Sequence, residues 1–84
     1  MRQAITVEAR FEAEGLIHPL IFEWHGRRHV VTSLGRQWDQ ENERHFLVVT
    51  PDDRVYELAL APDQARLGGT WWLCRAPEGG RAKA

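Results

Sequence analysis

The stretch Phe22-Glu-Trp-His-Gly-Arg-Arg-His-Val-Val-Thr-Ser-Leu34 decides the fold of this chain. Its first arm alternates apolar and polar side chains, and this alternation predicts that Leu20, Phe22 and Trp24 share one face of a strand. His25-Gly26 follows, with glycine where a two-residue turn requires a positive φ angle. Because the β-branched run Val-Val-Thr comes next, the stretch predicts a β-hairpin.

The same alternation of apolar and polar residues recurs along the rest of the chain. It predicts an all-β fold, built as a single antiparallel curved sheet or a small SH3-like barrel of five to six strands. A flat sheet is not expected, because it would leave its tryptophan side chains in water. The predicted strands are residues 4–12, 16–24, 27–36, 44–50, 54–60 and 70–75.

Glycine, proline and acidic residues predict how these strands are connected. Gly35 indicates a bulge, and Thr50-Pro51-Asp52-Asp53 is typical of a type I turn that closes a second hairpin. The polar residues 39–43 are expected in a solvent-exposed loop, and residues 61–69 in a connection with at most one helical turn. The strands are therefore expected to follow one another through short connections.

Length and composition indicate one small domain. The chain has 84 residues, of which 43% are hydrophobic, and four tryptophans whose large rings bury much area each. We expect residues 1–76 to form a single β domain and residues 77–84 to form a disordered tail, because the tail has nothing to bury. In the last strand, Trp71 and Leu73 are expected on one face and Trp72 on the other.

The chain is expected to be cytoplasmic, with no membrane contact. It has a single cysteine, so no internal disulfide can form, which fits a reducing compartment. Its first residues reach acidic side chains before the apolar segment of a signal peptide could form. No apolar run approaches the length that spans a membrane.

Six residues are candidates for a binding surface, because small β-barrels bind partners through aromatic and basic side chains. Residues 25–38 carry three arginines and no acidic residue, whereas residues 39–63 carry two arginines against seven acidic residues. The basic block favours a local nucleic-acid surface, but arginines beside a turn are also ordinary solvated charges. Trp38 and Trp72, if exposed, instead favour a protein partner. Trp24 is expected in the core. The candidates are Arg27, Arg28, His29, Arg36, Trp38 and Trp72.

No catalytic or metal-binding residue is predicted, and no cofactor is expected. The four histidines, at positions 18, 25, 29 and 45, lack the compact ligand spacing of a structural zinc site. Cys74 lies in an apolar strand, which predicts an inert buried thiol. Asp52 and Asp53 are explained by the turn, and Gly68-Gly69 lacks the lysine and the flanking elements of a phosphate-binding loop.

Several short motifs resemble an uncharacterised family of small bacterial domains, over about residues 17–76. They are Trp24-His-Gly-Arg-Arg-His-Val-Val, Leu34-Gly-Arg-Gln-Trp38, His45-Phe-Leu-Val, Val55-Tyr-Glu-Leu and Trp72-Leu. Some members of that family stand alone, and others form the C-terminal tail of proteins related to Y-family DNA polymerases. The resemblance therefore implies association with nucleic acid or a repair complex. It carries over no catalytic residue, and the acidic residues 39–63 depart from a DNA-binding pattern.

Taken together, these features predict a non-catalytic binding module. We expect it to bind a protein partner, or a second copy of itself as a homodimer, through exposed aromatic residues. The alternative is an accessory domain that binds nucleic acid and is linked to DNA repair, using the arginines and tryptophans of residues 24–38. The two differ in salt dependence, because electrostatic binding of nucleic acid weakens steeply as salt rises.

Overall fold

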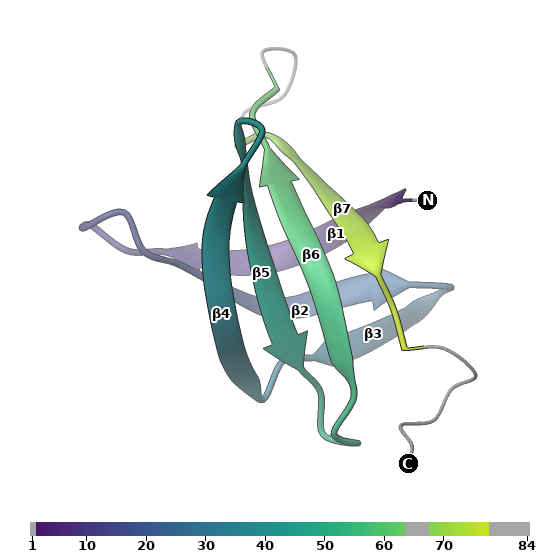
Figure 1. The fold of residues 1–84 in the computed structure, drawn as a ribbon. Helices are drawn as coiled ribbons and strands as arrows, with labels where there is room; N and C mark the ends of the chain where they lie inside the picture. The colour runs from purple at the N-terminus through teal and green to yellow at the C-terminus, as the bar shows by residue number, and fades with distance from the viewer. Residues whose placement is uncertain (1, 64–67, 78–84) are drawn as a thin grey trace.

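The computed structural model describes residues 2–63 and 68–77, and in these residues the chain forms seven strands and no helix (Figure 1). The predicted all-β fold is therefore confirmed, with one strand more than the upper number expected. No helix in the described part of the chain is long and apolar enough to cross a membrane. The strands are β1 (Gln3–Phe11), β2 (Ile17–Trp24), β3 (Arg27–Val30), β4 (Ser33–Gln40), β5 (Glu43–Val49), β6 (Val55–Ala61) and β7 (Thr70–Arg75).

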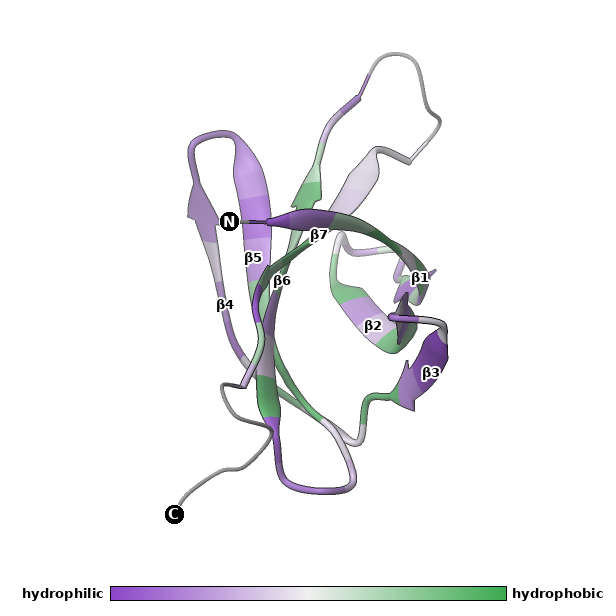
Figure 2. Ribbon diagram, turned by 90° about the vertical axis from the view of Figure 1, so that its right-hand side faces the viewer, coloured by the Kyte–Doolittle hydropathy of each residue, from purple (hydrophilic) through white to green (hydrophobic). Residues whose placement is uncertain are grey.

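All seven strands belong to one antiparallel sheet, in the order β3-β2-β1-β7-β6-β5-β4. β1 and β7 join the two ends of the chain at the middle of the sheet. The sheet curls so that β1, β2 and β3 cross behind β4 to β7, and Figure 2 shows the two groups of strands facing each other. The result is a half-barrel, which confirms the expected curved sheet.

The predicted hairpin at His25-Gly26 is confirmed as the connection between β2 and β3. Both turn residues have positive φ angles, 54° at His25 and 74° at Gly26. Trp24 pairs with Arg27 directly across the turn, so the loop contains two residues. Two-residue loops with positive φ match the twist of the strands that they join, and glycine adopts this conformation without strain.

The third predicted strand, residues 27–36, is divided in the structure. β3 stops early, and Val31 and Thr32 cross from the β3 edge of the sheet to the β4 edge. The Val31 amide donates to the Leu20 carbonyl at 2.9 Å, and the Thr32 amide donates to the Val49 carbonyl at 2.8 Å. Each of the two amides therefore has a hydrogen-bond acceptor, one in β2 and the other in β5. This allows the chain to pass from one side of the sheet to the other without leaving a backbone donor unpaired.

The loop predicted at residues 39–43 is wrong, because β4 and β5 continue almost to the tip of their hairpin. Asp39 pairs with Arg44 in the ladder, and their side chains form an ion pair at 2.9 Å. Only Glu41 and Asn42 form the turn, with φ angles of 51° and 68°. Ladder hydrogen bonds and cross-strand charge pairs support the polar ends of these two strands, so a polar stretch of sequence does not by itself indicate a loop.

Two other predicted features of β4, β5 and β6 are confirmed. The register between β4 and β5 shifts between Leu34 and Gln37, which places the expected bulge around Gly35. The Asp53 amide donates to the Thr50 carbonyl at 2.9 Å and closes the turn between β5 and β6. Both features follow from local turn and bulge chemistry.

A bulge in β2 overturns the predicted position of Leu20. The register between β1 and β2 skips this residue, and its side chain is 44% exposed while Phe22 is fully buried. Pro19 takes the inward position instead. Because Pro19 lies beyond the end of β3, β2 has a neighbouring strand on one side only, where a residue without an amide hydrogen is tolerated. Trp24 packs against the core, as expected.

The core lies between the two groups of strands. The rings of Phe22 and Tyr56 meet edge to face with their centroids 5.0 Å apart, so β2 and β6 contact each other across the interior. In β7, Trp71 and Leu73 are buried in the core and Trp72 is not, as predicted. The buried residues of the core are Phe22, Phe46, Val48, Tyr56, Leu58, Trp71 and Leu73.

Two sequence predictions concern segments that the structure leaves largely undescribed. The single helical turn expected within residues 61–69 falls mainly on residues 64–67, and the disordered tail falls mainly on residues 78–84. Both segments lie outside the described residues.

We predict that Leu58→Ala lowers the free energy of unfolding by about 2–5 kcal/mol, because Leu58 is fully buried and its truncation leaves a cavity. Leu20→Ala is the matched control: it removes the same atoms from a side chain that is 44% exposed, and should cost less than about 1 kcal/mol. Urea unfolding followed by tryptophan fluorescence measures both values. Equal losses would contradict the bulge that turns Leu20 outward.

Candidate binding site on the outer face of the sheet

A row of four side chains crosses the outer face of β4, β5, β6 and β7. The ladders pair Trp38 with His45, His45 with Ala59, and Ala59 with Trp72. Successive residues of a strand point to opposite faces of the sheet, and His45, Ala59 and Trp72 each adjoin a core residue along the chain. Trp38 shares their face because it pairs with His45. The row therefore points away from the core and has a tryptophan at each end.

Trp38 is held in one orientation by three contacts. Its ring stacks on His45 with the centroids 5.4 Å apart and the planes 17° from parallel. Its indole nitrogen donates to Gln40 Oε1 at 3.0 Å. The guanidinium carbon of Arg36 lies 5.2 Å from the ring centroid, which is within the range of a cation–π interaction.

Arg2 connects the second tryptophan to the acidic residues of the face. Its guanidinium carbon lies 4.5 Å from the centroid of the Trp72 ring. Two of its nitrogens donate to the two carboxylate oxygens of Glu43 at 2.9 and 2.7 Å, a bidentate pair. The hydrogen bonds from Arg2 lower the pKa of Glu43, and the same contact raises the pKa of Arg2.

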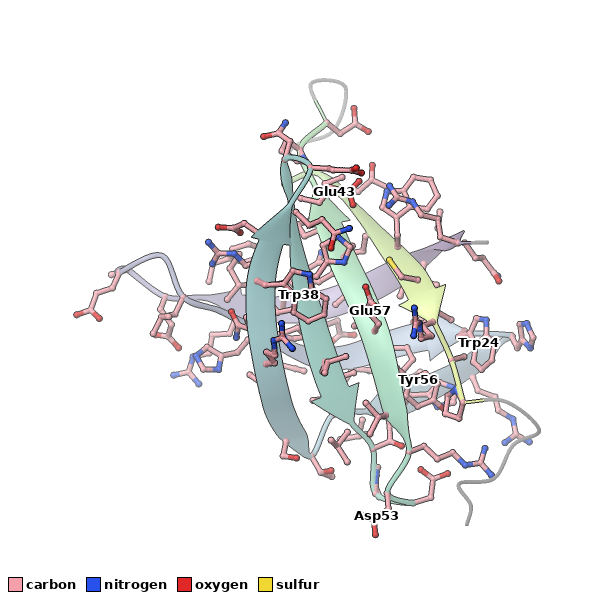
Figure 3. The ribbon with its side chains drawn as sticks, in the orientation of Figure 1. Trp24, Trp38, Glu43, Asp53, Tyr56 and Glu57 are labelled. Carbon is pink, nitrogen blue, oxygen red and sulfur yellow. The ribbon has the colours of Figure 1, made fainter. Side chains whose placement is uncertain are left out.

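His45 lies between two carboxylates. Its Nδ1 atom is 2.9 Å from Glu57 Oε2 and its Nε2 atom is 3.3 Å from Glu43 Oε1, while its side chain is only 8% exposed. Figure 3 shows Trp38, Glu43 and Glu57 over the front of β4, β5 and β6. Because an ionised carboxylate only accepts, a protonated imidazole donates to both acids at once, whereas a neutral one donates to a single acid.

Cys74 joins this cluster because of a bulge between β6 and β7. The register passes from the pair Leu58–Leu73 to the pair Glu57–Arg75, so that Cys74 and Arg75 both lie opposite Glu57. Burial raises the pKa of the Cys74 thiol, and the negative charge of Glu57 raises it further. The thiol is therefore protonated at neutral pH and is a weak nucleophile.

His45, Glu57 and Cys74 also form a group of potential metal ligands. One nitrogen, one carboxylate oxygen and one sulfur from these residues lie within 4.8 Å of one another. These are donor types that zinc accepts. The three residues have no compact ligand spacing along the chain, because they come from three different strands, β5, β6 and β7.

The structure divides the six candidates predicted from the sequence into two groups. Three of them lie on the outer face: Arg36 and Trp38 in β4, and Trp72 in β7. The other three lie in β3, at the opposite end of the strand order: Arg27, Arg28 and His29.

Two of the β3 candidates, Arg28 and His29, are engaged in contacts of their own. Arg28 forms ion pairs with Glu8 at 3.1 Å and with Glu23 at 3.4 Å. The His29 ring stacks on Phe22 with the centroids 4.9 Å apart, and its Nε2 atom is buried with no hydrogen-bond partner among the described residues. The Trp24 ring packs against the same aromatic side chains, with its centroid 6.0 Å from that of Tyr56. The basic and aromatic residues of the 24–38 block thus lie in two regions of the molecule.

Sequence reasoning missed the part that four residues play on the outer face. Arg2, Glu43 and Glu57 were not considered, and His45 was considered only as a zinc ligand and rejected. For two of them a signal existed. The turn at residues 50–53 sets the register of β5 and β6, and alternation from the apolar positions then places His45 and Glu57 on the same face. Arg2 and Glu43 are 41 residues apart, and no local pattern predicts their contact.

No family model, curated protein or solved structure matches this chain.

We predict that Glu43→Gln flattens the acid limb of the stability curve. The folded pKa of Glu43 lies below its ordinary value of 4.5, so its stabilising effect is complete above that pH and is lost as the pH falls through the folded pKa. Wild-type stability should thus fall more steeply below about pH 5 than that of the variant, by about 0.5–1 kcal/mol in total. Urea unfolding across this range measures the slopes. Glu14→Gln, in an exposed turn, should keep the wild-type slope.

We also predict slow modification of Cys74 by a thiol reagent. At pH 7 the folded protein should react more slowly than the same chain in denaturant, because the raised pKa keeps the thiol protonated. The rate should increase as the pH is raised beyond the ordinary thiol value of 9.0. Glu57→Gln removes a negative charge that raises this pKa, so it should speed the reaction. A rate that Glu57→Gln leaves unchanged would contradict the electrostatic part of this account.

Proposed function

We propose that this domain is a non-catalytic binding module that docks another protein through the outer face of β4 to β7. The observation that carries the proposal is the cross-strand row in which Trp38 and Trp72 stand on either side of His45 and Ala59. Tryptophan is the residue type most enriched among the anchors of protein interfaces. A second copy of this chain is included among the partners that the proposal covers.

The arrangement of the two tryptophans supports a preorganised surface. Trp38 is held by His45, Arg36 and Gln40, and Trp72 carries the guanidinium of Arg2. Side chains that are already ordered lose less conformational entropy when a partner binds.

Charged residues around the row support a polar rim. Arg2 pairs with Glu43, and Arg75 approaches Glu57 at 3.8 Å. Apolar anchors surrounded by charged residues are the usual layout of a protein interface.

Nucleic acid is the second candidate partner. It is favoured by the position of Arg36 over the Trp38 ring, since aromatic rings beside arginine stack bases and neutralise phosphate. The resemblance to tails of Y-family polymerase-like proteins points the same way. Glu43 and Glu57 on the same face weaken this candidate, because their charges repel phosphate. We place the module in the cytoplasm, where its single cysteine stays reduced.

We predict that a photo-crosslinking amino acid in place of Leu47, whose strand partner is Glu57 on the outer face, gives a defined protein adduct in the host cell. The same substitution at Leu20, on the β2 bulge, is the control and should give none. Trp38→Ala or Trp72→Ala should lower the affinity by at least about 30-fold, as expected for a tryptophan anchor. Sedimentation equilibrium identifies a second copy as the partner. Absence of an adduct, together with a monomer at about 1 mM, would contradict the proposal.

An oligonucleotide titration separates the two candidates. Side-chain NMR signals of Arg36 and Trp38 should stay in place when a single-stranded oligonucleotide is added. Shifts at these residues, with an affinity that falls steeply between about 50 and 200 mM salt, would instead support nucleic-acid binding.

A further inference from the structure

The cluster formed by His45, Glu57 and Cys74 brings three different metal-ligand types together. His45, Glu57 and Cys74 come from the adjacent strands β5, β6 and β7, and one donor atom of each lies within 4.8 Å of the others. In a tetrahedral zinc site, donor atoms stand about 3.5 Å apart, as follows from zinc–ligand distances of about 2.0–2.3 Å. A movement of about 1 Å closes the difference, and the partly buried side chains of Glu57 and Cys74 can supply it by rotation.

A second observation concerns the ring nitrogen of His45 that does not face Glu57. Glu43 Oε1 lies 3.3 Å from His45 Nε2, on the side of the ring opposite Nδ1. The tautomer with its proton on Nε2, on the side of this carboxylate, has the lone pair of Nδ1 directed toward Glu57 Oε2, 2.9 Å away. Metal-binding histidines almost always donate their other ring N–H in this way, most often to a carboxylate or a carbonyl. Glu43 is itself held by both nitrogens of Arg2.

The surroundings keep these groups in place. The bulge in β7 sets Cys74 opposite Glu57, and bulges commonly re-aim a side chain at a functional site. The Trp38 ring lies nearly parallel to the imidazole and fixes its plane. Arg2 and Arg75, the two cations next to the acids, each contact a carboxylate and offset the negative charge of the cluster.

We propose that His45 Nδ1, a Glu57 carboxylate oxygen and the Cys74 sulfur bind one Zn²⁺ ion, with the fourth position open to water and Glu43 orienting the imidazole. Zn²⁺ replaces the proton of the Cys74 thiol, so binding releases a proton and strengthens as the pH rises. The metal site does not depend on the protein-docking proposal, because the proposed anchors of docking, Trp38 and Trp72, are not among the metal ligands.

The test uses the full chain, treated with a chelator, kept in a reductant that does not bind metals, and titrated with Co²⁺ as a probe for Zn²⁺. One Co²⁺ per chain should bind, with the near-ultraviolet absorption of a cobalt–thiolate bond and the intense visible bands of tetrahedral coordination. Zn²⁺ should displace it. Cys74→Ser should abolish the thiolate absorption, and Glu43→Gln should lower the affinity by about 10–100-fold.

The matched control is His18→Gln. His18 lies 4.0 Å from Glu12 and forms another histidine–glutamate pair, without a cysteine, so its loss should leave Co²⁺ binding unchanged. Circular dichroism and the melting temperature establish that each variant folds. If Cys74→Ser does not fold, the Cys74 and His45 carbon signals of the wild-type protein give the same information, since both should shift when one equivalent of Zn²⁺ is added. No thiolate absorption, or unshifted Cys74 and His45 signals, would overturn the proposal and leave an ion-pair cluster only.

Discussion

The contact between Phe22 and Tyr56 is the interaction on which the rest of the structure depends. These two rings belong to strands that are well separated in the sheet, and they meet only because the sheet bends back on itself. No helix in the described residues covers the apolar face, so the sheet has to cover itself. Curvature is therefore the means by which a chain of 84 residues obtains a core.

The outer face is a consequence of the same bending. Each core residue of β5, β6 and β7 fixes its neighbours on the convex side, because side chains alternate along a strand. His45 precedes Phe46, and Glu57 precedes Leu58. Packing of these two core residues therefore places both polar side chains on the outer face, whether or not the polar side chains interact with each other. The polar cluster and the tryptophan row thus share one set of strand registers, and a slip in the core would dismantle both.

Sequence reasoning succeeded where the decisive chemistry is local. The turn at His25-Gly26, the turn after Thr50 and the opposite faces of Trp71 and Trp72 each depend on a few adjacent residues. It failed for Leu20, whose direction is set by a register shift against β1. It also did not predict that His45, Glu57 and Cys74 lie together, because the position of Cys74 depends on a bulge in the pairing of β6 with β7.

The crossover at Val31 and Thr32 gives the half-barrel a seam. One of these amides bonds to Leu20 in β2, and the other bonds to Val49 in β5, so two consecutive residues bridge the two borders of the sheet. Any widening of the seam must break these bonds before it disturbs the strand ladders. Breathing motions of the whole molecule should therefore appear first as paired solvent exchange of these two amide protons, well ahead of those in β5 and β6.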